Sequence, residues 1–178
     1  MGSLDHPFNP LSLALGSGAT LVARTLDREI KHLGEIVKIC NDHKGTSFVD
    51  IYQNCNIFND GAFASKTDKE TKAENVLWLE NGQPMLFGAE KNKGIHMDGN
   101  KPEIVELNGK FSADDILLHN ESDFVIASML ASLTYKEEFP DPIGVLYAIN
   151  APVYEELATE QVPSAIEKRG TGSIQELL

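Results

Sequence analysis

The residues best placed to do chemistry surround Cys55, one of two cysteines in the chain. Residues 52–60 read Tyr-Gln-Asn-Cys-Asn-Ile-Phe-Asn-Asp, so three asparagines, a glutamine and an aspartate lie close to one thiol. Asn and Asp side chains bind their own backbone and favour tight turns. A thiol in such a turn can be a metal ligand, a nucleophile or an inert small side chain, and the local sequence leaves all three open.

The position of this turn follows from the elements before it. An apolar run at 48–52 predicts a buried strand, and apolar residues at helical spacing predict a helix over 26–40. A short helix at 11–15, which Asn9 is expected to cap, and a strand at 19–24 precede them. This alternation predicts an α/β fold with a parallel sheet, in which ligands collect beyond the carboxyl ends of the strands. The apolar face of the longer helix carries Leu26, Ile30, Leu33, Val37 and Cys40.

The other candidate residues receive structural roles. Cys40 lies on the apolar face of the helix, which favours a small core residue. Thr25 or Asp27 is expected to cap the start of that helix. Four histidines share no local motif with a carboxylate or a thiol, and each is expected at the surface or at a helix end. They are His32, His43, His96 and His119. The sequence therefore assigns no catalytic residue.

The rest of the chain predicts smaller elements. Residues 62–75 are charged, with almost no apolar side chains, and predict a linker or mobile loop. Asn81-Gly82 lies between two apolar runs and predicts a hairpin, because this dipeptide suits a tight turn. The further expected elements are short strands within 93–107, a helix at 124–133 capped by Ser122 or Asp123, a strand at 142–149, a helix at 153–160 and a polar tail from Pro163 that docking would order.

Composition excludes several classes of function. The net charge of −12 and the pI of about 4.7 argue against binding along a nucleic-acid backbone. No apolar run is long enough to span a bilayer, and the first residues do not resemble a signal peptide, so we expect a cytoplasmic protein without membrane contact. Two cysteines form neither a disulfide framework nor a four-cysteine metal site. Nucleotide-binding glycine motifs and hydrolase motifs are also absent from the sequence.

Four segments together resemble a known family. DHPFNPLSLALGSGATLVAR at 5–24 and FVDIYQNCNIFNDGAF at 48–63 resemble consecutive segments of the β subunit of 2-oxoacid:ferredoxin oxidoreductases, the 2-oxoglutarate type in particular. PMLFG at 84–88 and DPIGV at 141–145 resemble pieces of the C-terminal extension of that subunit. The resemblance covers nearly the whole chain and is most specific in its first 63 residues.

The resemblance implies an oxidative decarboxylation. These enzymes use thiamine diphosphate with Mg²⁺ to decarboxylate a 2-oxoacid, pass electrons through a [4Fe–4S] cluster to ferredoxin, and transfer the acyl group to coenzyme A. The cysteine that matches Cys55 is the last of four cluster ligands in the family, so the resemblance makes Cys55 a metal ligand. No residue of this chain is assigned to thiamine diphosphate.

The sequence also departs from the family. The Gly-Asp-Gly motif that binds the metal and the diphosphate, the three earlier cluster cysteines and the substrate loop do not occur in it. We therefore expect the C-terminal half of a β subunit: residues 1–63 from the C-terminal part of a thiamine-diphosphate-binding parallel-sheet domain, and residues 64–178 as a smaller α+β extension. Such a chain would be inactive alone and would need the α subunit in an oligomeric complex.

Two alternatives remain open at this stage. The chain could be a non-catalytic module for subunit assembly, with Cys55 vestigial. Cys55 could also be a nucleophile, which requires a base within hydrogen-bond reach, and no histidine lies in its local motif.

Overall fold

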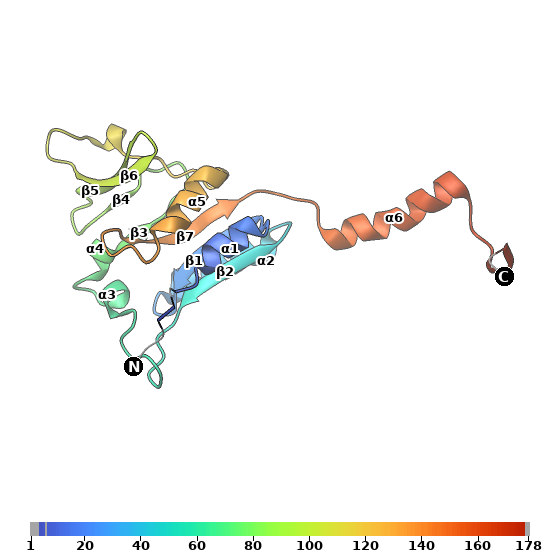
Figure 1. The fold of residues 1–178 in the computed structure, drawn as a ribbon, viewed down its shortest axis with the longest axis horizontal. Coiled ribbons are helices and arrows are strands. Elements are labelled where there is room, and N and C mark those ends of the chain that lie inside the picture. The colour runs from blue at the N-terminus through green and yellow to red at the C-terminus, as the bar shows by residue number, and fades with distance from the viewer. Residues whose placement is uncertain (1–3, 6, 177–178) are drawn as a thin grey trace.

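A four-stranded sheet in the order β2-β1-β7-β3 is the centre of the fold (Figure 1). Its strands are β1 (Leu21–Leu26), β2 (Ser47–Tyr52), β3 (Val76–Trp78) and β7 (Asp141–Ala148). β1 runs parallel to β2 and antiparallel to β7, while β3 runs parallel to β7. The predicted α/β class and the parallel pairing of the first two strands are confirmed.

The computed structural model describes residues 4–5 and 7–176. The residues used to exclude a signal peptide lie partly outside this set, which leaves out residues 1–3, 6 and 177–178. None of the helices within the described residues has both the length and the apolar character needed to cross a bilayer.

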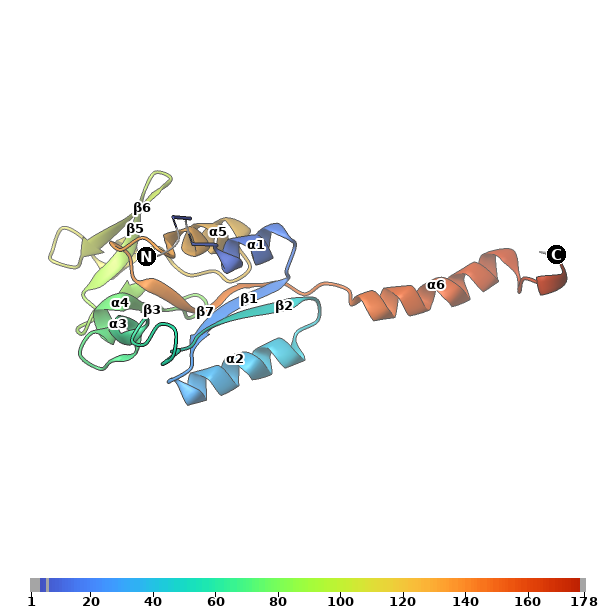
Figure 2. The same ribbon diagram turned by 60° about the horizontal axis from the view of Figure 1, so that its bottom comes forward.

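Helices cover both faces of the four-stranded sheet (Figure 2). The helices α1 (Pro10–Gly16) and α5 (Phe124–Leu133) lie on one face, and α2 (Ile30–Asp42) lies on the other. The predicted caps of α1 and α5 are confirmed. The Asn9 side chain accepts a hydrogen bond from the Ser12 amide, and Asp123 accepts from the first amides of α5.

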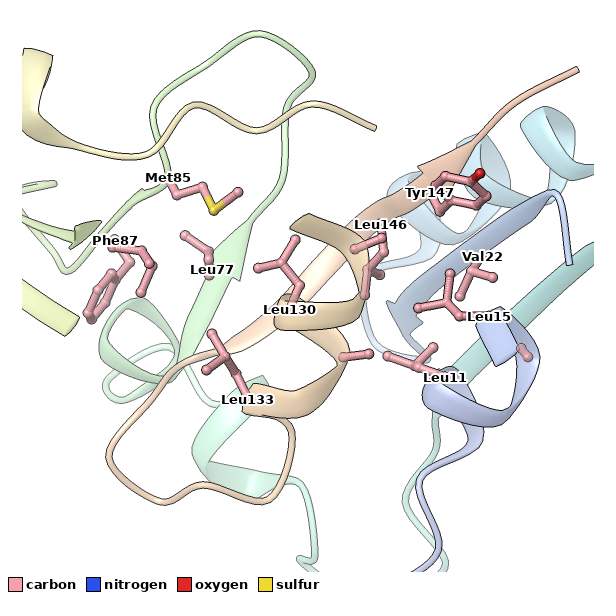
Figure 3. Close-up of a cluster of buried hydrophobic side chains, with 14 of the residues drawn as sticks. Leu11, Leu15, Val22, Leu77, Met85, Phe87, Leu130, Leu133, Leu146 and Tyr147 are labelled. Atoms are coloured by element: carbon pink, nitrogen blue, oxygen red, sulfur yellow. The ribbon is translucent and has the colours of Figure 1, made fainter. Parts of the chain in front are cut away.

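The largest apolar cluster fills the space between the sheet and the α1–α5 face (Figure 3). Leu11 of α1, Val22 of β1, Leu130 of α5 and Leu146 of β7 are fully buried there. Through Met85 the cluster continues to a second sheet, which has three strands. These contacts hold β1 in the interior of the molecule and fix the ends of the strands that carry the candidate site.

The two parallel strands differ in burial. Every residue of β1 is buried, whereas β2 is an edge strand in which only Tyr52 is buried. The prediction that 48–52 is a buried strand is therefore wrong for this chain. An apolar run identifies a strand, but it does not reveal whether the neighbour that would cover the outer edge is present.

The long helix begins later than predicted. Leu26 belongs to β1, and α2 starts at Ile30 without a side-chain cap. Neither predicted cap serves the helix. The Thr25 hydroxyl lies 2.8 Å from His32 Nδ1, and the Asp27 carboxylate accepts a hydrogen bond from the turn after β2.

The predicted apolar face of α2 is also partly wrong. Ile36 is the buried residue that packs on the sheet, while Ile30 and Val37 are 77% and 51% exposed. The helix carries apolar side chains on more than one stripe, and periodicity alone does not show which stripe faces the sheet.

A second, three-stranded sheet contains β4 (Leu86–Phe87), β5 (Lys93–Asp98) and β6 (Lys101–Glu106). The β5–β6 hairpin confirms the predicted strands around Asp98-Gly99-Asn100. The predicted Asn81-Gly82 hairpin is wrong. The turn itself forms, with the Gln83 amide 3.0 Å from the Glu80 carbonyl oxygen, but its flanking strands pair elsewhere, β3 with β7 and β4 with β5.

Residues 62–75 form short helices rather than the predicted linker. They contain α3 (Ala64–Thr67) and α4 (Lys72–Asn75). Their charges bind other parts of the chain: Lys66 Nζ lies 3.0 Å from Asp141 Oδ2, and Lys72 pairs with Glu29. Local sequence showed the polarity of this segment but not its ion-pair partners.

The chain after residue 63 contributes to both sheets, because β7 pairs with β1 and β3 pairs with β7 in the four-stranded sheet. The expected domain boundary at residue 63 therefore does not separate one sheet from the other. The boundary itself stays a prediction. At the end of the chain, α6 (Tyr154–Arg169) extends away from the body (Figure 1) and has no buried residue. It is longer than the predicted helix at 153–160. Two short 3₁₀ helices, η1 (Ala113–Asp115) and η2 (Ile174–Glu176), complete the described elements.

Candidate functional site

The turn after β2 is held by its own polar side chains. The Asn54 backbone amide donates to Asp27 Oδ2 at 3.1 Å, which ties the turn to the segment that follows β1. The Asn54 side chain donates to Asp60 Oδ1 and accepts from the Gly61 amide, both at 2.9 Å. These bonds close residues 54–61 into a loop, called here the Cys55 loop. The predicted tight turn is confirmed, and an asparagine side chain replaces regular secondary structure as the hydrogen-bond partner.

Cys55 is exposed in this loop and surrounded by backbone amides. The Asn59 amide donates to the Cys55 carbonyl oxygen at 3.0 Å, which curls the chain around the side chain. Hydrogen bonds from the backbone amides of Phe58, Ile57 and Asn59 lower the pKa of the Cys55 thiol. Amide donors favour the thiolate, and the thiolate is the form that binds metals and attacks electrophiles.

The thiol of Cys40 lies in an environment opposite to that of Cys55, because it is partly buried. It is half-buried in α2 and packs against the cluster of Leu21, Ala23 and Ile36. Burial raises the pKa of its thiol. The structure thus matches the prediction that Cys40 is a small core residue, and it separates an inert thiol from an activated one.

The tip of the Cys55 loop is apolar. Ile57 and Phe58 come two and three residues after the cysteine and are 81% and 90% exposed. Beside the loop lies a polar hollow of about 340 Å³ whose walls include Asp27, Arg28 and Asn54. Two large apolar side chains in solvent beside an activated thiol are typical of a surface that another chain covers.

A buried charged cluster lies close behind this loop. Arg24 of β1 is fully buried, and its Nε lies 3.0 Å from Asp50 Oδ2 of β2. Its Nη1 donates to Thr134 Oγ1 at 2.9 Å, and its guanidinium carbon lies 4.5 Å from the centre of the Tyr52 ring. Burial raises the pKa of Tyr52, with Arg24 acting in the opposite direction.

Asp141 of β7 extends this cluster to a third strand. Its carboxylate is 4.0 Å from Arg24 Nη1 and 3.0 Å from Lys66 Nζ. Arg24 Nη2 is buried and has no hydrogen-bond partner among the described residues. We call Arg24, Asp50, Asp141 and Lys66 the Arg24 cluster. This cluster was not predicted from the sequence, although Arg24 and Asp50 are opposite charges in two apolar strands and face each other in the parallel register.

Two of the histidines make contacts inside the fold. His119 is 2% exposed, with Nε2 2.8 Å from the Val145 carbonyl oxygen, so the expectation of a surface position is wrong for it. Burial lowers its pKa. His32 contacts the Thr25 hydroxyl and is half-buried. Within the part of the chain that the structure describes, no group of three or more His, Cys, Asp or Glu side chains could hold a metal ion.

Comparisons with known proteins place the chain among relatives of one kind. No family model matches it. It is 36% identical over 182 residues to the 2-oxoglutarate oxidoreductase subunit KorB of Mycobacterium tuberculosis, an alignment that covers 100% of this chain and 48% of KorB. It is 41% identical over 58 residues to the 2-oxoacid:ferredoxin oxidoreductase subunit beta of Saccharolobus solfataricus, which covers 33% of this chain and 19% of that protein.

A solved structure has the same fold. The 2-oxoglutarate:ferredoxin oxidoreductase of Magnetococcus marinus, solved with 2-oxoglutarate, coenzyme A and succinyl-CoA bound, superposes with a TM-score of 0.57. The match covers 97% of this chain and 43% of that chain at 22% identity. The chain spans about half the length of the relatives that match it throughout. The chain is therefore homologous to KorB over its whole length, and a segment of 58 residues is similar to a 2-oxoacid:ferredoxin oxidoreductase β subunit.

Proposed function

We propose that this chain is the C-terminal half of the β subunit of a 2-oxoacid:ferredoxin oxidoreductase that acts on 2-oxoglutarate. The observation that carries the proposal is the similarity of the whole of this chain to about half of KorB, whose name specifies 2-oxoglutarate. In this proposal residues 1–63 complete a thiamine-diphosphate-binding domain, and residues 64–178 are the extension that follows it.

Cys55 is the residue of this chain that would hold a cofactor. An exposed thiol whose pKa is lowered by three amides fits one ligand position of a [4Fe–4S] cluster. The sequence contains only one further cysteine, Cys40, whose thiol is half-buried and less acidic. The remaining thiolates of the cluster would come from outside this chain.

Other cofactors would bind mainly to the rest of the complex. When bound, thiamine diphosphate with Mg²⁺ supplies the electron sink for decarboxylation, the cluster passes electrons to ferredoxin, and coenzyme A accepts the acyl group. The contribution of the described residues is to position the cluster ligand. The Arg24 cluster joins β1, β2 and β7, and Asn54 with Asp27 fixes the loop at the ends of the first two strands.

The proposed partners are the α subunit, ferredoxin and the rest of the β subunit, in an oligomeric cytoplasmic complex. The exposed edge of β2 and the exposed apolar residues Ile30 and Val37 on α2 support a covering partner. Alone, the chain is expected to be inactive and to bind neither a stable cluster nor thiamine diphosphate.

The test uses the complete β subunit that contains this chain, co-expressed with its α subunit. We expect ferredoxin reduction that requires coenzyme A and is at least about tenfold more efficient with 2-oxoglutarate than with pyruvate, a difference of roughly 1.4 kcal/mol in transition-state binding. Equal efficiency would refute the substrate assignment, and absence of any 2-oxoacid-dependent reduction by an intact complex would refute the function.

A binding measurement tests whether thiamine diphosphate binding depends on the other half of the β subunit. Calorimetric titration of the 178-residue chain with thiamine diphosphate and Mg²⁺ is expected to show no micromolar binding. The diphosphate needs a divalent cation held by acidic oxygen ligands. In the proposed assembly, these ligands belong to the other half of the β subunit. Micromolar binding would mean that the cofactor site lies within these residues.

A non-catalytic assembly role is the second candidate, and α6 favours it. Tyr154 and Val162 on this helix are 79% and 62% exposed, and the helix has no buried residue. In that case substitution of Cys55 would leave the cluster and the activity of the complex unchanged, whereas deletion of α6 would prevent assembly.

A further inference from the structure

A cavity of about 390 Å³ lies between the two sheets, away from the Cys55 loop. Its walls come from α4, from β3 of the four-stranded sheet and from β4 of the three-stranded sheet. This volume falls at the lower end of the range for small-molecule sites, which often form where two structural units meet. The proposed function gives this cavity no role.

The walls combine an apolar floor with a basic rim. Val76, Leu86 and Phe87 are apolar lining residues, and the half-buried Trp78 adds a flat aromatic surface. Lys69, Lys72 and Lys91 also line the cavity, and Glu80 is the acidic side chain among the lining residues. An apolar floor with a few charged groups is the composition that orients an amphipathic ligand.

This concentration of lysine departs from the character of the chain. The chain has 15 basic and 27 acidic residues and a net charge of −12, yet three lysines and one glutamate line the cavity. Lys72 pairs with Glu29 and lies 5.9 Å from the centre of the Trp78 ring. Lys69 and Lys91 form no ion pair with any residue that the structure describes. Their positive charge is therefore available to an anionic ligand.

The loop that carries Lys91 is fastened to the helix that carries Lys72. The Gly88 amide donates to the Ala73 carbonyl oxygen at 2.8 Å, and the Ala89 amide donates to Glu74 Oε1 at 3.2 Å. Lys91 itself has a positive φ of 51°, which is uncommon and strained for a residue with a side chain. The loop thus holds a lysine at the rim in a conformation that glycine would adopt more easily.

We propose that this cavity binds a phosphorylated ligand with a flat aromatic group, of the adenine nucleotide class. The base stacks on Trp78 over the apolar floor, and Lys69 and Lys91 bind the phosphates. The proposed ligand is a free adenine nucleotide, whereas coenzyme A contains the same adenosine diphosphate group but already has a role in the proposed function.

Trp78 makes this proposal directly testable, because it is the only tryptophan in the chain. Titration of the 178-residue chain with ADP is expected to quench tryptophan fluorescence in a saturable manner, with calorimetry as a second readout. Adenosine and pyrophosphate, which lack one half of the recognised group, are expected to bind at least about tenfold more weakly. Tighter binding of coenzyme A than of ATP and ADP would make the cavity part of the acyl-acceptor site and would overturn the proposal of a separate nucleotide site.

The variant Lys69→Gln/Lys91→Gln is expected to weaken ADP binding at least about tenfold, because each lysine contributes a charge-assisted hydrogen bond. The control Lys110→Gln/Lys136→Gln removes the same charge outside the cavity and is expected to bind ADP normally. Lys91→Gly provides a second test, since glycine accepts the backbone conformation and circular dichroism can confirm the fold. Absence of saturable ADP binding, or equal loss in the control, would overturn the proposal.

Discussion

The Arg24 cluster and the Cys55 loop meet at β2, which carries Asp50 and leads into the loop, but they use polar groups in opposite ways. The cluster is centred on the fully buried Arg24 and joins three strands through carboxylates that are mostly buried. The loop leaves its thiol in solvent and directs backbone amides toward it. A buried ionic group contributes to one fixed geometry, whereas an exposed thiolate is available to bind a metal.

Cys40 shows that the difference depends on environment rather than on residue type. The same side chain, packed on the sheet by α2, has its pKa raised by burial. At Cys55 the amides act in the other direction. The predicted consequence is that substitutions in the cluster affect stability most, while substitutions in the loop affect thiol chemistry most.

The largest effect on stability is expected from Asp141→Asn. This change removes the carboxylate shared by Lys66 and Arg24 and leaves two cations without it, which costs about 3 kcal/mol in the free energy of unfolding. Urea denaturation measures it. The matched control is Asp68→Asn, whose pair with Arg28 is half-exposed and contributes less than about 1 kcal/mol. Equal costs for the two variants would remove the distinction between buried and exposed polar groups.

The next effect is expected in thiol reactivity. At pH 7 iodoacetamide should modify Cys55 faster than Cys40, because a lower thiol pKa and greater exposure both increase the amount of reactive thiolate. The rate at Cys55 should reach half its maximum below the ordinary thiol pKa of about 8.5, and the rate at Cys40 above it. Mass spectrometry of Cys40→Ala and Cys55→Ala assigns each rate. Similar rates would contradict the role given to the amides.

A smaller effect is expected from Asn54→Ala. It removes the side-chain bonds to Asp60 and Gly61 and should destabilise the loop by about 1 kcal/mol. Hydrogen exchange at the Gly61 amide should then be faster, with global stability nearly unchanged. Asn56→Ala is the control, because the neighbouring Asn56 is an exposed residue of the same type. Unchanged protection at Gly61 would show that Asn54 does not close the loop.

The sequence predicted the elements with local signals. Asn9 and Asp123 were identified as caps because short polar side chains before an apolar run satisfy free helical amides. The turn at Cys55 followed from its asparagines, and the α/β class followed from the alternation of helix and strand. Each of these features depends on neighbours in the sequence.

The features that depend on distant partners were not predicted. Leu26 was assigned to a helix because periodicity does not reveal that a strand continues between two neighbours. Asn81-Gly82 forms its turn, yet β3 finds β7 across a long separation in sequence. Lys66 was expected in solvent because nothing near it in sequence indicates Asp141. The Arg24 cluster combines residues from three strands and was missed for the same reason.

The central claim is that Cys55 is a cluster ligand and Cys40 is not. The most direct test places Cys55→Ala and Cys40→Ala separately in the complete β subunit, assembled with its α subunit, and measures iron content together with the electron paramagnetic resonance signal of the reduced cluster. We expect the Cys55 variant to lose the signal or to contain substantially less iron, while the Cys40 variant retains both. Normal iron and a normal signal in the Cys55 variant would contradict the claim.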